Sequence, residues 1–424
     1  MLDQKLAADI IAAVAAGFDR QLEETMALTR LPSLRGQEAT AQDFMAGHYR
    51  DRGLSVDHWQ INVADIEHLP GFSPVAVSYD NAFNVVGTHR PREKKGRSLI
   101  MNGHIDVVPT GPADLWTRPP FDSYITGDWL YGRGAGDMKA GLYGCLAAFD
   151  ALDRLGLRPA AEVYLQSVVE EECTGNGALA CLQRGYRAEA AIIPEPSGDS
   201  VMLGQLGVMW FQVKVRGRPT HVGHAGTGSN AIEAAFPIVA KLHELEERWN
   251  SEKHALWEGH KHPINFVVSR IEGGDWTSSV PAWCTFDMRI SFYPGMELAR
   301  VRRDVEETVR AAASGHPFLA NNPPEIVYHG FQAEPYVVKN ADAAMSCLEA
   351  AHRQVYGADL PKIFATATTD ARFFGLYADT PALVYGPVSE DYHGFDERVS
   401  VSSLKNVTAG MAVFLADWCG VEKK

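Results

Sequence analysis

Strand-like and helix-like segments alternate along the first half of this chain, and the alternation resumes near its end. Apolar segments such as "RSLIMNGHIDVV" and "AEVYLQSVV" have the length of buried strands, whereas "GDMKAGLYGCLAAFDALDRLGL" has helical periodicity. Strands that alternate with helices usually form a parallel sheet covered by helices on both faces. The sequence therefore predicts an α/β fold with a mainly parallel sheet.

The pattern changes near Leu206. The segment "GVMWFQVKVRG" alternates strictly between apolar and polar residues, a long helical pattern follows in "NAIEAAFPIVAKLHELEERW", and two more strand patterns precede another helix. We predict that residues 206–321 form an inserted α+β domain, called the lid below. Residues 1–205 and 322–424 are then predicted to form one main domain that the lid interrupts.

The strand "SLIMNGHIDVVPTG" contains an unusual pair of polar residues. His104 and Asp106 are two positions apart among apolar neighbours, so their side chains point to the same face of a strand. An imidazole that binds a metal ion commonly donates its other ring N–H to a carboxylate, which fixes the ring's orientation. His104 is therefore a candidate metal ligand, and Asp106 is predicted to hold its ring.

Further acidic side chains and a second histidine follow other predicted strands. They are Asp137 in the glycine-rich loop "GRGAGDMKAG", the run Glu170, Glu171 and Glu172, Glu195 in "PEP", and His393 in "DYHGFD". In open α/β sheets, ligands bind at the carboxyl ends of the strands. Carboxylates gathered at that edge repel one another unless cations neutralise them, and histidine with carboxylate ligands suits zinc, or alternatively cobalt or manganese.

Composition narrows the class of protein and its surroundings. The chain of 424 residues has a formal net charge of -14 at pH 7, which argues against nucleic acid or an anionic membrane as a partner. Six cysteines without a close pair are typical of reduced thiols, and the amphipathic N-terminus is not a signal peptide pattern. A cytoplasmic protein is expected.

At these same residues the sequence resembles the M20 family of metallopeptidases and deacylases. The resemblance covers almost the whole chain, and the branch with acetylornithine deacetylase and succinyl-diaminopimelate desuccinylase is the most similar. The motifs occur in the family's order, namely "NGHIDVVP", "GRGAGDMKAG", "EEECTGNGA", "PEP", "GRPTHVG" and "YHGFDE".

The resemblance implies two divalent, zinc-type ions bridged by Asp137. It implies that His104 and Glu195 complete the site of one ion, and that Glu172 and His393 complete the site of the other. Glu171 would be the general base. Glu170 stands where the family usually has Asp, which leaves the register of the three glutamates open by one position.

The resemblance also implies roles for two lid residues. His221 in "GRPTHVG" matches a histidine that reaches the active site of the partner subunit in a homodimer, with the nearby His224 as a competitor that does not match the motif. Arg289 matches an arginine that binds a substrate carboxylate, for which a guanidinium is suited. Ser278 stands near a position at which the family often has Asn, so the identity of the substrate stays open.

The predicted function is that of a two-metal amidohydrolase that removes an N-acyl group from an amino-acid-like small molecule. A dipeptidase or carboxypeptidase of the same family is the alternative within this class. The alternative outside it is a non-catalytic scaffold that keeps only the fold. A scaffold would be expected to lose at least one predicted ligand or the predicted base, and the sequence retains all of them, which favours an enzyme.

Overall fold

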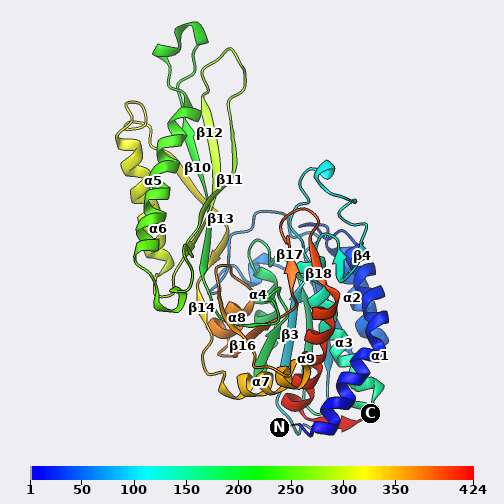
Figure 1. The fold of residues 1–424 in the computed structure, drawn as a ribbon. Coiled ribbons are helices and arrows are strands. Elements are labelled where there is room, and N and C mark those ends of the chain that lie inside the picture. The colour runs from blue at the N-terminus through cyan, green and yellow to red at the C-terminus, as the bar shows by residue number, and fades with distance from the viewer. Residues whose placement is uncertain (1) are drawn as a thin grey trace.

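The computed structural model describes residues 2–424, and within them the largest element is a nine-stranded mixed sheet (Figure 1). Eight strands follow one another across the sheet, and a ninth, β15, pairs with β9 beside the last of them. In that order the strands are β1 (Ser55–Gln60), β2 (Phe83–His89), β7 (Val163–Val168), β3 (Leu99–His104), β8 (Ala190–Ile193), β16 (Ala382–Tyr385), β9 (Val201–Gln205) and β14 (Tyr336–Val337), with β15 at Lys362–Ala365.

The centre of this sheet is parallel, as the strand–helix alternation predicted. Strands β7, β3, β8 and β16 all run in the same direction, whereas the pairs β1–β2, β2–β7 and β9–β14 are antiparallel. Every residue of β3 and of β8 is buried, as expected for strands covered on both faces. Because the central strands are parallel, their carboxyl ends meet at one edge.

Helices cover both faces of the sheet. The helices α1 (Gln4–Thr29), α3 (Ala140–Arg154), α7 (Asp342–Tyr356) and α9 (Val401–Cys419) pack against one another on one face. Helix α2 (Ala39–Asp51) packs against β1 and β2. On the opposite face from α1 and α3, helices α4 (Asn176–Gln183) and α8 (Ala371–Tyr377) contact each other (Figure 1). The predicted α/β architecture is confirmed.

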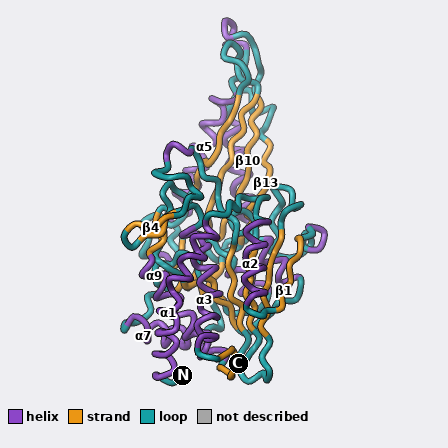
Figure 2. The backbone as a smooth tube through the Cα atoms, turned by 90° about the vertical axis from the view of Figure 1, so that its right-hand side faces the viewer, coloured by secondary structure: helices purple, strands orange, loops and turns teal. Residues whose placement is uncertain are grey.

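A second, antiparallel sheet lies in the inserted part of the chain and is called the lid sheet. Its strand order is β11 (Phe266–Gly273), β12 (Trp283–Phe292), β10 (Gly207–Arg216) and β13 (Glu325–Ala333). Helices α5 (Ala231–Ser251) and α6 (Leu298–Ser314) cover one face, where alternate residues of β10 and β12 enter a separate apolar core. Figures 1 and 2 show this part extending away from the main domain like an arm.

The pairing of β13 bears on where the lid ends. The predicted boundary lies at residue 321, but Glu325–Ala333 pairs with β10 in the lid sheet, and the chain returns to the larger sheet only at β14. The division into domains remains a proposal, and this pairing favours extending the lid to Ala333. The alternation in "EIVYHGFQA" is weak, and no turn signal separates it from the α/β pattern that follows.

Shorter elements complete the main domain. A small sheet contains β4 (Tyr124–Thr126), β5 (Trp129–Tyr131), β18 (Arg398–Ser400) and β17 (Ser389–Glu390), and β6 (Leu157–Pro159) pairs with β19 (Val421–Lys423). Short helical turns occur at Val63–Asp65, Ala113–Leu115, Ala135–Lys139, Val222–Thr227 and Ala255–Trp257. Among residues 2–424, no helix has the length and apolar character needed to cross a membrane.

Candidate metal centre

The predicted ligands lie at the carboxyl edge of the parallel strands. His104 is the last residue of β3, Glu171 and Glu172 follow β7, and Glu195 comes two residues after β8. Because β7 and β8 both pair with β3, these three strand ends are neighbours. The sheet therefore positions the side chains, and the loops only complete the cluster.

His104 lies at the centre of the cluster and is 1% exposed. Its Nδ1 donates to the backbone carbonyl of Asp106 at 2.9 Å. Its Nε2 lies 3.1 Å from Asp137 Oδ1 and 3.7 Å from Glu195 Oε2. Since donation from Nδ1 leaves Nε2 as the free nitrogen of a neutral ring, the imidazole is oriented to bind a cation among these carboxylates.

Asp137 lies between the two histidines. Its Oδ1 faces His104 Nε2, and its Oδ2 lies 3.4 Å from His393 Nε2. His393 also lies 3.0 Å from Glu172 Oε2. One carboxylate that reaches two imidazoles in this way is suited to bridge two cations.

The glutamate run divides into one anchor and two site residues. Glu170 has a left-handed backbone, with φ of 67°, and its carboxylate accepts from Arg35 Nε at 2.8 Å and from the Tyr79 hydroxyl at 2.9 Å. Glu170 is thus engaged away from the cluster, whereas Glu171 Oε2 lies 3.9 Å from His104 Nε2. This geometry supports the register in which Glu171 and Glu172 are the functional pair.

Asp106 contacts the same loop. Its two carboxylate oxygens accept from the backbone amides of Glu171 at 3.3 Å and Glu172 at 3.2 Å. Its carboxylate lies 3.7 Å from His104 Nδ1, so the ring is held by the carbonyl of Asp106, while the carboxylate fixes the glutamate loop. One residue therefore orients a histidine and two glutamates together.

Glu397 was not singled out in the sequence, although it closes the "YHGFDE" motif. This residue is 1% exposed, and its carboxylate accepts from the amides of Gly134, Gly136 and Asp137 and from Arg133 Nη1 at 2.7 Å. Arg133 in turn donates to the carbonyl of Gly394 at 2.9 Å. Glu397 thus ties the loop of His393 to the loop of Asp137.

The charges of the cluster shift its pKa values strongly. Burial raises the pKa of Glu195 to about 8 and raises the pKa of Glu171 well above its usual value. The carboxylate of Glu172 raises the pKa of His393 to about 11, and neighbouring carboxylates outweigh burial to raise the pKa of His104. At neutral pH this group of acids needs additional positive charge, either as protons or as metal ions.

The donor set fits divalent metal ions. Two groups of side chains place one ligand atom each within 4.8 Å of one another, namely His104 with Glu171 and Glu195, and His104 with Asp137 and Glu172. Imidazole with carboxylate oxygens is the ligand type of zinc, cobalt and manganese sites. The cluster therefore offers ligands suited to a divalent metal ion.

The two predicted lid residues lie outside the cluster. His221 is on an exposed loop, where its Nδ1 accepts from the amide of Gly223, and no hydrogen bond or ion pair joins it to the cluster within residues 2–424. Arg289 is half-buried on β12, opposite Trp210 of β10, and burial lowers its pKa. Within the described chain Arg289 makes neither a hydrogen bond nor an ion pair, so its guanidinium is available to a ligand.

A chain of contacts joins the base of the lid sheet to the glutamate loop. Trp210 packs edge-on against Phe331, the guanidinium of Arg372 lies 5.4 Å from the Phe331 ring, and Arg372 Nη2 donates to the carbonyl of Thr174 at 3.0 Å. Arg372 belongs to "TTDAR", which therefore lies between the lid sheet and the cluster.

Residues 100–417 match the model of peptidase family M20/M25/M40. The chain belongs to this family. It is 28% identical, over 98% of its length and 99% of the relative, to an N-formyl-4-amino-5-aminomethyl-2-methylpyrimidine deformylase from Halalkalibacterium halodurans. It is 30% identical to a succinyl-diaminopimelate desuccinylase from Thioalkalivibrio sulfidiphilus, over 74% of this chain and 81% of the relative.

A solved structure of this M20 fold comes from yeast. A dipeptidase from Saccharomyces cerevisiae superposes with a TM-score of 0.78, covering 97% of this chain and 98% of that chain at 15% identity. This likeness confirms the fold. The family match and the relatives named above make this protein a hydrolase of amide bonds.

Proposed function

We propose that this M20 protein is a two-metal amidohydrolase that removes an N-acyl group from a small amine or amino acid. The observation that carries the proposal is the cluster at the sheet edge, where Asp137 lies between His104 and His393 and each histidine has a further carboxylate beside it. A cluster built only for stability would pair its acids with arginine, as Glu170 is paired with Arg35.

The ligands divide into two sets around Asp137. His104 and Glu195 would hold one ion with one oxygen of Asp137, and Glu172 and His393 would hold the other ion with the second oxygen. Two bound dications of the zinc type would acidify a water toward neutral pH and polarise the acyl carbonyl. Zinc is the expected ion, with cobalt or manganese as alternatives.

Glu171 is the proposed general base. It is 6% exposed, it lies beside His104, and its backbone amide is fixed by Asp106. Burial raises the pKa of its carboxyl, which makes its anion a stronger proton acceptor than an exposed glutamate. Glu171 would take a proton from the attacking water and pass it to the leaving amine.

The lid is proposed to complete the site in a homodimer. Strand β11 lies at the edge of the lid sheet, and Val267 and Ile271 on it are each 49% exposed. Phe236 on the adjoining helix α5 is 56% exposed. An edge strand with exposed apolar residues can pair with a second copy, and His221 is proposed to enter the partner's active site.

Six buried, unpaired cysteines support the proposal of a reducing, cytoplasmic location.

A pyrimidine deformylase is the second candidate. The relative of that name matches this chain almost end to end, and its name gives an N-formyl aminomethylpyrimidine as substrate. Trp210 Nε1 is buried and has no hydrogen-bond partner among residues 2–424. A heterocyclic ring nitrogen could accept from this indole, whereas a substrate carboxylate would bind the free guanidinium of Arg289.

The decisive test is an assay of hydrolysis with the protein loaded separately with zinc, cobalt or manganese. The substrates are N-formyl, N-acetyl and N-succinyl amines, with dipeptides tested in parallel. Glu171→Gln should abolish turnover and leave the metal content unchanged. The matched control is Glu162→Gln. Glu162 immediately precedes β7, whereas Glu171 follows the other end of that strand. Wild-type rates in Glu171→Gln would refute the base assignment, and turnover of dipeptides alone would favour the peptidase alternative. Metal binding without any turnover would favour a scaffold.

A further inference from the structure

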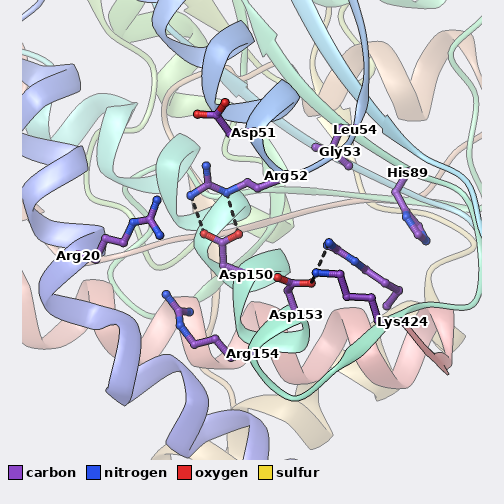
Figure 3. A pocket seen from close by; sticks show the side chains of 11 residues that line it. Arg20, Asp51, Arg52, Gly53, Leu54, His89, Asp150, Asp153, Arg154 and Lys424 are labelled. Carbon is purple, nitrogen blue, oxygen red and sulfur yellow. Dashed lines mark hydrogen bonds and ion pairs between the residues drawn. The ribbon is translucent and has the colours of Figure 1, made fainter.

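A basic hollow lies at the end of the main domain opposite the metal centre. Its volume is about 550 Å³, and its cationic and imidazole lining consists of Arg20, Arg52, His89, Arg154, Arg158 and Lys424 (Figure 3). His89 ends β2 and pairs with Val163 at the start of β7, whereas the cluster follows the end of β7. Figure 1 shows both chain ends at this pole, away from the lid.

Two of the three carboxylates in the hollow are already paired. Both oxygens of Asp150 accept from Arg52, at 2.7 Å each. Asp153 Oδ1 lies 2.8 Å from Arg158 Nη2 and 2.7 Å from Lys424 Nζ. These pairs fix the walls of the hollow, and Asp153 has two cationic neighbours for its single negative charge.

The remaining arginines have nitrogen atoms to spare. The Arg154 side chain makes no hydrogen bond or ion pair within the described chain, and its guanidinium lies over Gly17 of α1, where an added Cβ would be only 2.1 Å from Arg154 Cζ. Arg20, one turn after Gly17 on α1, has Glu24 as its one ion-pair partner among residues 2–424, at 3.9 Å. Arg158 Nη1 is buried and has no partner among residues 2–424.

The basic lining of the hollow contrasts with the chain's net charge of -14. The hollow carries five arginine and lysine side chains against the carboxylates of Asp51, Asp150 and Asp153. The guanidinium groups of Arg20, which reaches Glu24 at 3.9 Å, and of Arg154 lie on neighbouring helices (Figure 3). Guanidinium groups bind phosphate oxygens in a bidentate manner.

We propose that this hollow is a binding site for a small bisphosphorylated molecule. One phosphate would lie between Arg20 and Arg154, and the second would reach Lys424, whose side chain is 56% exposed. The volume lies within the range of small-molecule sites. Helix α3 separates the hollow from the cluster, since it begins just after Asp137 and ends at Arg154, about 22 Å along its axis. The site does not depend on the proposed hydrolytic function.

Calorimetry with fructose 1,6-bisphosphate and metal-loaded full-length protein tests this site. The double variant Arg20→Gln with Arg154→Gln should weaken binding by about tenfold or more, since it removes two charge-assisted contacts. The control is Arg90→Gln with Arg353→Gln, because both arginines are exposed and paired elsewhere on the surface. Wild type and control should bind with equal affinity, and raised salt should weaken both.

The metal centre is a second place where a phosphate group could bind. His393→Ala separates the two contributions, because it should leave binding in the hollow unchanged. Equal affinity of wild type and the Arg20/Arg154 variant, or loss of all binding in His393→Ala, would overturn the proposal. Wild-type protein that shows no saturable binding at millimolar ligand would overturn it as well. Hydrolysis by the Arg20/Arg154 variant is expected to match that of wild type.

Discussion

Replacing Glu397 by alanine should both destabilise the protein and weaken the metal centre. The carboxylate is 1% exposed and accepts from Arg133 and from the amides of Gly134, Gly136 and Asp137. Removing one partner of a buried ion pair costs about 3–5 kcal/mol. Each buried amide left without an acceptor adds about 1–3 kcal/mol, although such terms are not fully additive.

The free energy of unfolding should therefore fall by about 4 kcal/mol or more in Glu397→Ala, as measured by urea denaturation of metal-free protein. Glu397→Gln retains one acceptor oxygen but loses the charge opposite Arg133, and we expect a loss of about 3 kcal/mol. Because Glu397 positions the loops of Asp137 and His393, metal affinity should fall by about 10–100-fold in both variants.

Glu390→Gln is the matched control. Glu390 lies in the same loop region and pairs with Arg398, but its side chain is 48% exposed. An exposed pair contributes at most about 1 kcal/mol, so this variant should unfold and bind metal as wild type does. If Glu397→Ala and Glu390→Gln have equal stability and equal metal affinity, Glu397 does not position the ligands.

Three further predictions concern buried or unpaired groups around the site. Arg35→Ala leaves the buried Glu170 carboxylate without its cation, so unfolding free energy should fall by about 3 kcal/mol in urea titrations, and an unchanged midpoint would contradict the anchoring role. Burial raises the pKa of Glu38 from 4.5 to about 8. Between these two pH values the folded state keeps a proton that the unfolded state has lost, so the contribution of Glu38 to the free energy of unfolding falls as the pH rises. Glu38→Gln should remove that loss, so in thermal unfolding the variant should gain stability relative to wild type as the pH is raised from 6 to 9. A stability difference between variant and wild type that does not change with pH would refute this prediction. Arg289→Ala should raise KM for substrates with a carboxylate at least tenfold while kcat changes little, whereas an unchanged KM would favour the pyrimidine substrate.

The edge at which the candidate ligands gather could be predicted from the sequence, because parallel strands place their carboxyl ends at one edge. His104 ends a buried strand and Glu195 comes two residues after another, so their positions required only the strand pattern and the rule for ligand sites. The same reasoning could not resolve the run of three glutamates. Their division depends on the left-handed backbone of Glu170 and on Arg35, which lies far away in the sequence.

Contacts between distant loops explain what else the sequence did not reveal. Glu397 looks like one more acidic residue until the fold brings four donors from the Asp137 loop to it. The strand Glu325–Ala333 follows a long helix and resembles a return to the main domain, yet it pairs with β10. The role of His221 depends on a second subunit, so the residue stays a prediction.

The most direct test of the two-metal centre is the metal content of purified protein, measured by elemental analysis after loading with zinc. We expect two ions per chain in wild type and the loss of tight binding at both sites in Asp137→Asn, because Asp137 faces both histidines. A wild-type content of one ion or none, or an Asp137→Asn protein that still holds two, would contradict it.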